Sequence, residues 1–282
     1  MSAAMQVAGG RYEVSAPDRE AYARDGVVCL RGVVAPDEAR HMLDVSLDFM
    51  QSGRGRVREG QRKDGDTGRF FSAAYMSASE PPFRDFAEHS ALPAVASQLM
   101  DSPTVRFYYD QLFIKEPGTP APTPWHNDLP FWPFAGNDLV SLWVALTPVN
   151  RQSSGLDYVA GSHRWGKMFQ AVTPDFDPCF MNPDLEPCPD YSKPENQDGH
   201  NVLSWEMQPG DVLAHHPMAV HGAGGNASTA NRRVGLSVRY LGRDVAWNPR
   251  PHTTNPPVMP NVGPGAYPDD EAAFPTVWPP RG

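Results

Sequence analysis

The sequence predicts an α+β fold that is mainly β, in which N-terminal helices precede an antiparallel sandwich or jelly roll. Helix-like patterns of apolar residues come first, whereas short strand-like runs with Gly and Pro turns follow from Val105 onward. The chain contains 31 prolines and 24 glycines among 282 residues. This composition implies many loops and short elements, and it suits a β-rich domain better than a helical bundle.

The N-terminal part, residues 15–53, is predicted to form a helix, a strand and a second helix. Ser15 can cap the first helix, because its hydroxyl can accept from a free amide of the first turn. The apolar run at 27–30 is a short buried strand. The apolar residues of 36–51 repeat at the spacing of one helix face. Residues 82–101 are helical again, with a break at a Leu-Pro pair.

The second part of the chain is predicted to consist of strands, because branched and aromatic residues alternate there between turn residues. The clearest runs cover residues 105–115, 138–146, 207–215 and 233–241. The stretch 247–282 carries ten prolines, and we expect it to run extended over the surface.

Two segments lack helix or strand periodicity. Residues 53–69 hold six basic and three acidic residues, which predicts a solvated mobile loop. The alternative is a lid, or a patch that grips an anionic substrate. Residues 170–204 are long and rich in proline, and such loops are usually functional or disordered. Whether either segment acts as an active-site lid stays open.

Composition limits the organisation of the chain and its partners. No linker or repeat divides it, so we predict one domain over 1–282, with a core at about 105–245 and a Pro-rich tail at 247–282. A net charge of −9 argues against nucleic acid or an anionic membrane as partner. No apolar run approaches a membrane span, and the N-terminal residues lack a signal-peptide pattern. Three cysteines make no disulfide framework, so we expect a cytoplasmic protein. The oligomeric state is not predicted.

The run Trp125-His126-Asn127-Asp128 has the residue types of a metal site, with His221 as a third candidate ligand. A His and a carboxylate two positions apart on a strand point to the same face. A second His from a distant strand can complete the site. Two His and one carboxylate form the ligand set of non-haem Fe(II) oxygenases. Alone the short pattern is weak, because a core histidine and a turn aspartate would look the same.

Surrounding features favour the metal interpretation. His126 and Asp128 follow a Pro-rich loop at the opening of a predicted strand, where a site at a barrel mouth would need them. Glycines after His221 let the backbone turn sharply or pass close to a ligand. Arg232 lies eleven residues beyond His221, at the start of another strand. Its guanidinium can hold the distal carboxylate of 2-oxoglutarate through two hydrogen bonds.

Residues 115–149, the GSHRWG run at 161–166 and residues 210–233 together closely resemble the phytanoyl-CoA dioxygenase family. The resemblance covers roughly residues 20–245. It implies a double-stranded β-helix (jelly-roll) core and an enzyme that uses Fe(II), 2-oxoglutarate as cosubstrate, and O2. It further implies catalytic, iron-binding roles for His126, Asp128 and His221. For the cosubstrate, it implies that Arg232 binds the 5-carboxylate, that Trp143 lines the pocket and that Gln111 faces it.

Several positions qualify the resemblance. Asn127 stands where many members have Gln, at a position that points away from the metal. Ala223 stands where members often have Ser, which leaves one hydroxyl contact to 2-oxoglutarate missing or replaced. Related halogenases have Gly or Ala in place of Asp128, so a carboxylate here favours hydroxylation. His215 and His216 are expected to have structural roles.

The resemblance therefore implies a dioxygenase that hydroxylates an unactivated C–H bond of a small organic substrate and releases succinate and CO2. One alternative is that the same iron core catalyses desaturation, epoxidation, cyclisation or epimerisation of a natural product. Another is a non-catalytic, cupin-like metal-binding protein. The net charge of −9 gives no support for a substrate as large and anionic as an acyl-CoA.

Overall fold

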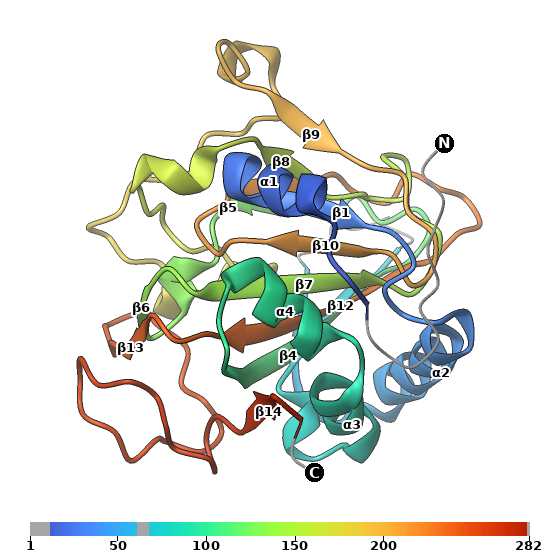
Figure 1. The fold of residues 1–282 in the computed structure, drawn as a ribbon. Coiled ribbons are helices and arrows are strands. Elements are labelled where there is room, and N and C mark those ends of the chain that lie inside the picture. The colour runs from blue at the N-terminus through green and yellow to red at the C-terminus, as the bar shows by residue number, and fades with distance from the viewer. Residues whose placement is uncertain (1–11, 61–67, 281–282) are drawn as a thin grey trace.

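An eight-stranded and a four-stranded antiparallel sheet form the core of the computed structural model, which describes residues 12–60 and 68–280 (Figure 1). The large sheet has the order β1 (Val27–Leu30), β10 (Val212–His215), β7 (Leu139–Ala145), β12 (Arg233–Leu241), β4 (Val105–Lys115), β3 (Phe70–Ala74) and β2 (Arg56–Glu59), with β14 (Thr276–Trp278) also paired to β4. The small sheet has the order β5 (Thr123–His126), β11 (His221–Ala223), β8 (Asp157–Val159) and β9 (Val202–Ser204). A further pair joins β13 (Val245–Trp247) to β6 (Phe134–Gly136).

The helices are concentrated in the N-terminal part, as the sequence predicts. They are α1 (Ala16–Asp25), α2 (Pro36–Ser52), α3 (Pro81–His89) and α4 (Leu92–Met100), and Figure 1 shows α4 lying across the large sheet. Ser15 caps α1 by accepting from the Asp18 amide, and Gly26 ends the helix with φ 76°. Short 3-10 helices occur at η1 (Met76–Ala78), η2 (Leu129–Phe131), η3 (Ser162–Trp165), η4 (Pro178–Phe180) and η5 (Pro194–Asn196).

Strand alternation gives the large sheet two chemically different faces. On β12, the even-numbered side chains from Val234 to Tyr240 belong to the main hydrophobic core, which includes residues of all four helices. The odd-numbered Arg233, Ser237 and Arg239 line a cavity on the other face. Successive side chains of any strand alternate between its two faces. In the large sheet one face carries the core and the other carries the cavity, and we call the second the functional face.

The structure corrects the expectations for two segments. Residues 56–59 of the predicted loop 53–69 form β2, paired with β3 at the sheet edge, while residues 61–67 lie outside the described residues. The Pro-rich stretch 247–282 is not only a surface segment. It adds β14 to β4, and Phe274 within it is fully buried.

The mainly β fold with flanking helices and a jelly-roll core is confirmed. In the described part of the chain, no helix is long and apolar enough to cross a membrane. The cysteines Cys29, Cys179 and Cys188 are all free.

Candidate active site

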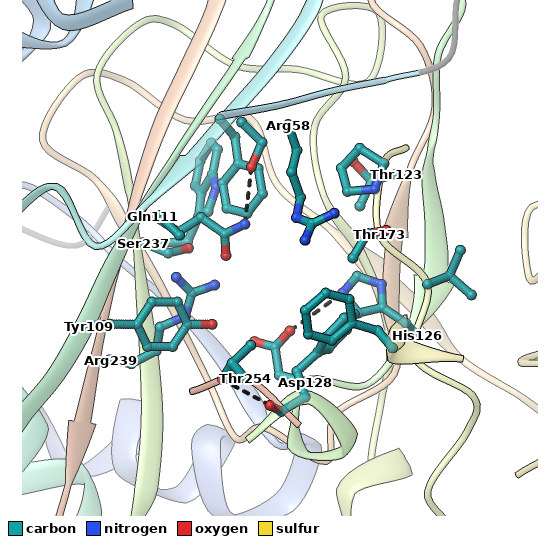
Figure 2. A pocket seen from close by; sticks show the side chains of 18 of the residues that line it. Arg58, Tyr109, Gln111, Thr123, His126, Asp128, Thr173, Ser237, Arg239 and Thr254 are labelled. Carbon is teal, nitrogen blue, oxygen red and sulfur yellow. Dashed lines mark hydrogen bonds and ion pairs between the residues drawn. The ribbon is translucent and has the colours of Figure 1, made fainter. Parts of the chain in front are cut away.

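A cavity of about 190 Å³ lies against the functional face of the large sheet. Strands β4, β7, β10 and β12 contribute side chains from one side, and β5 and β11 of the small sheet contribute from the other. Figure 2 shows His126 and Asp128 on one side of this cavity and Gln111, Ser237 and Arg239 on the opposite side. The residues predicted to bind metal thus face residues of the central strands.

His126, Asp128 and His221 are buried, and one ligand atom of each lies within 4.8 Å of the others. The Asp128 Oδ1 atom is 3.4 Å from His126 Nε2 and 3.9 Å from His221 Nε2. The two imidazole rings have centroids 4.3 Å apart. Three donors that converge in this way can hold one metal ion and leave its remaining positions open.

The sequence suggests that His126 and Asp128 lie on one strand. The structure brings the three residues together in a different way. His126 is the last residue of β5, not part of a strand opening, and it pairs directly with His221 across the small sheet. Asp128 lies beyond the strand in a helical conformation and is the N-cap residue of η2. The Asp128 and Leu129 amides both donate to the Pro217 carbonyl, which fixes this turn.

Backbone carbonyl groups of nearby residues orient both histidines. His126 Nδ1 lies 2.7 Å from the Pro124 carbonyl oxygen, and His221 Nδ1 lies 3.0 Å from that of Ala219. A carbonyl only accepts, so each Nδ1 carries the proton and donates it. The Nε2 lone pairs are therefore directed to the Asp128 side, as metal coordination requires.

Asp128 is further held by His215, which was expected to have a structural role only. His215 Nε2 is 3.3 Å from Asp128 Oδ2, and its Nδ1 is 3.1 Å from the Tyr158 hydroxyl. Burial opposes ionisation of Asp128, but the neighbouring imidazoles of His126 and His215 hold its pKa well below the usual value. Burial lowers the pKa of His221. An ionised carboxylate beside a neutral imidazole is the state that binds a divalent metal.

The expectation for Arg232 needs correction. Its Nε is 2.9 Å from both Glu116 carboxylate oxygens, its side chain is 38% exposed, and it does not line the cavity. Arg233 lines the cavity instead and is 1% exposed. The alternation of side chains along the strand explains this difference. β12 begins at Arg233, whose side chain points to the functional face, whereas Arg232 precedes the strand.

Arg233 has no carboxylate partner among the described residues. Its Nε donates to the Ser154 carbonyl at 3.2 Å, and its guanidinium lies 5.5 Å from the Trp143 ring centroid. Burial lowers its pKa to about 10, so it remains charged at neutral pH. Gly235 makes room for the Trp143 indole, because a Cβ atom at this position would lie 1.9 Å from the ring. A buried cation of this kind is stabilised by an anion.

The other predicted positions are also placed. Trp143 and Gln111 both line the cavity, and Gln111 donates to the Ser72 hydroxyl at 3.0 Å. Asn127 is fully buried and bonds to backbone atoms of Lys167 and Phe169, away from the ligand cluster. Ala223 is buried, and the Ser154 hydroxyl donates to the carbonyl of the following glycine.

Three further arginines line the cavity, and the sequence reasoning did not assign them individually. Arg239 lies on β12, and Arg56 and Arg58 lie on β2. Alternation on the predicted strand 233–241 could have placed Arg239 on the same face as Arg233. The two β2 arginines belong to the segment 53–69, for which the sequence suggests an anion-gripping patch without singling out individual residues.

Two histidines and a carboxylate on a jelly-roll core define the class of the protein as a non-haem Fe(II) oxygenase. A profile of the family described as Phytanoyl-CoA dioxygenase (PhyH) matches residues 22–234. The chain therefore belongs to the phytanoyl-CoA dioxygenase family, which confirms the resemblance. It is an oxygenase that depends on Fe(II), 2-oxoglutarate and O2, and the buried donor set fits that metal.

Known proteins resemble this chain in sequence or in fold. The multifunctional dioxygenase prhA of Penicillium brasilianum is 24% identical over 238 residues, covering 80% of this chain and 71% of that protein. The multifunctional dioxygenase ausE of Emericella nidulans is 25% identical, covering 83% and 76%. The carbocyclase SnoK from nogalamycin biosynthesis superposes with a TM-score of 0.73 at 22% identity, covering 95% of this chain and all of that one. The epimerase SnoN, solved with Fe3+, alpha ketoglutarate and nogalamycin RO, gives 0.70 at 22% identity, covering 93% and 97%.

Proposed function

We propose that this protein hydroxylates an unactivated C–H bond of a small organic substrate, with release of succinate and CO2. When bound, Fe(II) with 2-oxoglutarate supplies the activation of O2 and the oxidation of the substrate. His126, Asp128 and His221 hold the metal in this proposal. The carboxylate of Asp128 occupies a position that a halide would need, which supports oxygen transfer rather than halogenation.

Arg233 carries the proposal for the cosubstrate. It is a buried guanidinium without a carboxylate partner among the described residues, and it faces the same cavity as the three metal ligands. We propose that it binds the 5-carboxylate of 2-oxoglutarate through charge-assisted hydrogen bonds. Trp143 packs against the guanidinium and limits its movement, while Gln111 and Ser237 offer polar contacts on the same face.

The chain's own residues then orient the reaction. Tyr158 stacks on His221 with ring centroids 5.2 Å apart, and His215 fixes the Asp128 carboxylate. Phe131 and Phe180 close the cavity with apolar surface and thereby limit the access of water. The cavity is sized for a small molecule, and its apolar and aromatic wall favours an organic substrate.

The proposal is tested by anaerobic titration of 2-oxoglutarate into the Fe(II)-loaded protein, followed through the visible charge-transfer band of the complex. Arg233→Gln should weaken 2-oxoglutarate binding about 10- to 100-fold, the effect expected for loss of charge-assisted hydrogen bonds. Arg232→Gln is the matched control, since its side chain pairs with Glu116 outside the cavity, and it should bind within about twofold of wild type.

A substrate screen that measures succinate then tests turnover, and the structure of the oxidised product identifies the reaction. A hydroxylated product supports the proposal. A cyclised or epimerised product would assign one of the other oxidative outcomes to the same iron site. If Arg232→Gln, and not Arg233→Gln, weakened 2-oxoglutarate binding, the assignment of Arg233 would be wrong.

A further inference from the structure

Arg239 places a second buried guanidinium in the cavity, and neither the proposed iron site nor the proposed 2-oxoglutarate anchor uses it. Its side chain is 3% exposed and lies on the same face of β12 as Arg233 and Ser237. Figure 2 shows its guanidinium directed into the cavity beside Tyr109, across from His126.

Two nitrogens of this guanidinium lack an acceptor in the described part of the chain. Within residues 12–60 and 68–280, neither Nε nor Nη1 of Arg239 has a hydrogen-bond partner. The contact that holds it is the Tyr109 ring, whose centroid is 4.3 Å from the guanidinium carbon. An aromatic face attracts a cation but accepts none of its N–H groups in the way an oxygen does. A buried guanidinium in this state is costly unless a ligand supplies the oxygens.

The nearby carboxylates are already engaged. The Asp128 oxygens face His126, His221 and His215, and no ion pair joins Asp128 to Arg239 within the described residues. Asp110 on β4 accepts from the amide and the hydroxyl of Ser77. Asp175 and Asp177 both pair with Arg58.

Charge balance points to the missing group. With Fe(II) and 2-oxoglutarate bound as proposed, the charges of the metal, Asp128, the two cosubstrate carboxylates and Arg233 cancel. Among the buried groups that line the cavity, the positive charge of Arg239 is then left over, and one further negative charge there would neutralise it.

Tyr109 offers a second donor at the same place. Its hydroxyl oxygen accepts the Trp132 indole N–H at 3.1 Å, so its own proton is available to another acceptor. Burial raises the pKa of Tyr109, which keeps the hydroxyl protonated at neutral pH. The figure shows this hydroxyl turned toward the cavity (Figure 2).

We propose that Arg239 and Tyr109 bind a carboxylate of the prime substrate, so that the enzyme acts on small organic acids. The guanidinium and the phenol hold the acid group, and the apolar side chains Phe131, Leu156 and Phe180 surround the rest of the molecule. This inference rests on the proposed function for the identity of the reaction, but the binding of the acid group rests on the cavity alone.

The test uses benzoate as an aromatic acid probe and benzamide as its uncharged counterpart. Both are titrated by calorimetry into the full-length protein loaded anaerobically with Fe(II) and 2-oxoglutarate. The wild-type protein should bind benzoate more tightly than benzamide. Arg239→Gln should weaken benzoate binding about tenfold or more and leave benzamide unchanged, as expected for loss of a charge-assisted contact. Tyr109→Phe should reduce the preference for benzoate in part.

Arg56→Gln is the matched control, because Arg56 lines the same cavity but is exposed to solvent; it should keep the preference. Thermal unfolding and the Fe(II)–2-oxoglutarate band verify that each variant is folded and loaded. Equal binding of benzoate and benzamide by the wild type would overturn the proposal. So would an Arg239→Gln variant that loses 2-oxoglutarate binding but keeps the preference for benzoate. If the wild type lacked the band, the proposed function would fail, while titration of metal-free wild type and Arg239→Gln would still test the acid site.

Discussion

At the scale of single residues, the most consequential contact is the one between His215 and Asp128. His215 does not reach the proposed metal position, yet it joins the carboxylate to the Tyr158 hydroxyl through its two ring nitrogens. Because its pKa is lowered, chiefly by burial, the ring is neutral and donates a single proton. We infer that His215 sets the orientation of Asp128 before the metal binds.

Replacing His215 by Phe keeps a ring in the same space but removes both nitrogens. We expect the affinity for Fe(II) to fall about 10- to 100-fold, the usual effect of losing a partner of a metal ligand. Metal titration of the purified protein measures this directly. Tyr158→Phe removes only the outer hydrogen bond and should have a smaller effect. Unchanged metal affinity in His215→Phe would mean that Asp128 is positioned without it.

A second residue-scale property concerns stability rather than catalysis. Burial raises the pKa of Asp110 from 3.8 to about 6, although Ser77 donates to it from its amide and hydroxyl and the Arg239 charge favours ionisation. The folded protein therefore retains a proton on Asp110 that the unfolded chain releases. The stabilisation that comes from this proton on Asp110 is complete below about pH 4 and is lost as the pH rises through about 6.

Asp110→Asn should therefore flatten part of the pH dependence of unfolding. The free energy of unfolding of the wild type relative to the variant should fall by up to about 3 kcal/mol between pH 4 and pH 7. Urea denaturation at a series of pH values provides the measurement. Parallel curves for the two proteins would contradict the raised pKa.

Residue type and spacing identify some of the cavity residues but cannot separate two adjacent arginines. The cluster of His126, Asp128 and His221 could be predicted, because these residue types and their spacing are rare in combination. Arg232 and Arg233 are adjacent and identical in type, so the sequence could separate them only through the exact start of β12. A strand start is uncertain by a residue or two, and one residue reverses the face.

At the scale of elements, β2 and the segment 170–204 are joined by an ionic contact. Arg58 on β2 lies 2.8 Å from Asp175 and 3.0 Å from Asp177 of that segment. Residues of both segments line the cavity, so this contact connects two parts of its wall. The arrangement supports the hypothesis that the two segments move together when a substrate enters.

Arg58→Gln should loosen the 172–180 region without unfolding the protein. The groups are about one-third exposed, so the contact contributes modestly, and hydrogen exchange there should accelerate up to about fivefold. Mass spectrometry of exchanged peptides measures this change. Arg54→Gln is the control, since Arg54 pairs with Glu80, the residue that precedes α3. Equal effects of both variants would argue against a specific link.

Elements with strong periodicity were predictable, and the others were not. The helices α1 and α2 and the strands β4, β7 and β12 lie close to their expected ranges. β2 was missed because its sequence, RVRE, is charged and flanked by glycine. Such a strand forms only because β3 provides hydrogen-bond partners at the sheet edge, and no local pattern reveals that.

At the scale of the whole molecule, the C-terminal segment is part of the core. Trp247 and Phe274 pack against Phe134 with ring centroids 5.5 and 5.4 Å away, and Thr254 and Asn255 line the cavity. The high proline content conceals this role in the sequence, because proline breaks the periodic patterns from which burial is inferred.

Phe274→Ala should therefore destabilise the protein by about 3–5 kcal/mol, as for other buried aromatic residues. Met259→Ala in the same segment, at a side chain that is 61% exposed, should change stability by less than about 0.5 kcal/mol. Chemical denaturation of the two variants provides the comparison. Similar stabilities would show that the segment is only attached to the surface.

The position of β12 has a consequence for how the protein is made. β12 lies between β7 and β4 in the large sheet, yet a ribosome completes both neighbours long before residues 233–241 emerge. Until then each neighbour has an open edge, the kind of edge that invites pairing with another chain. The strand that fills the gap also carries Arg233 and Arg239. The nascent protein thus closes its open strand edges and places both arginines in the cavity in the same folding event.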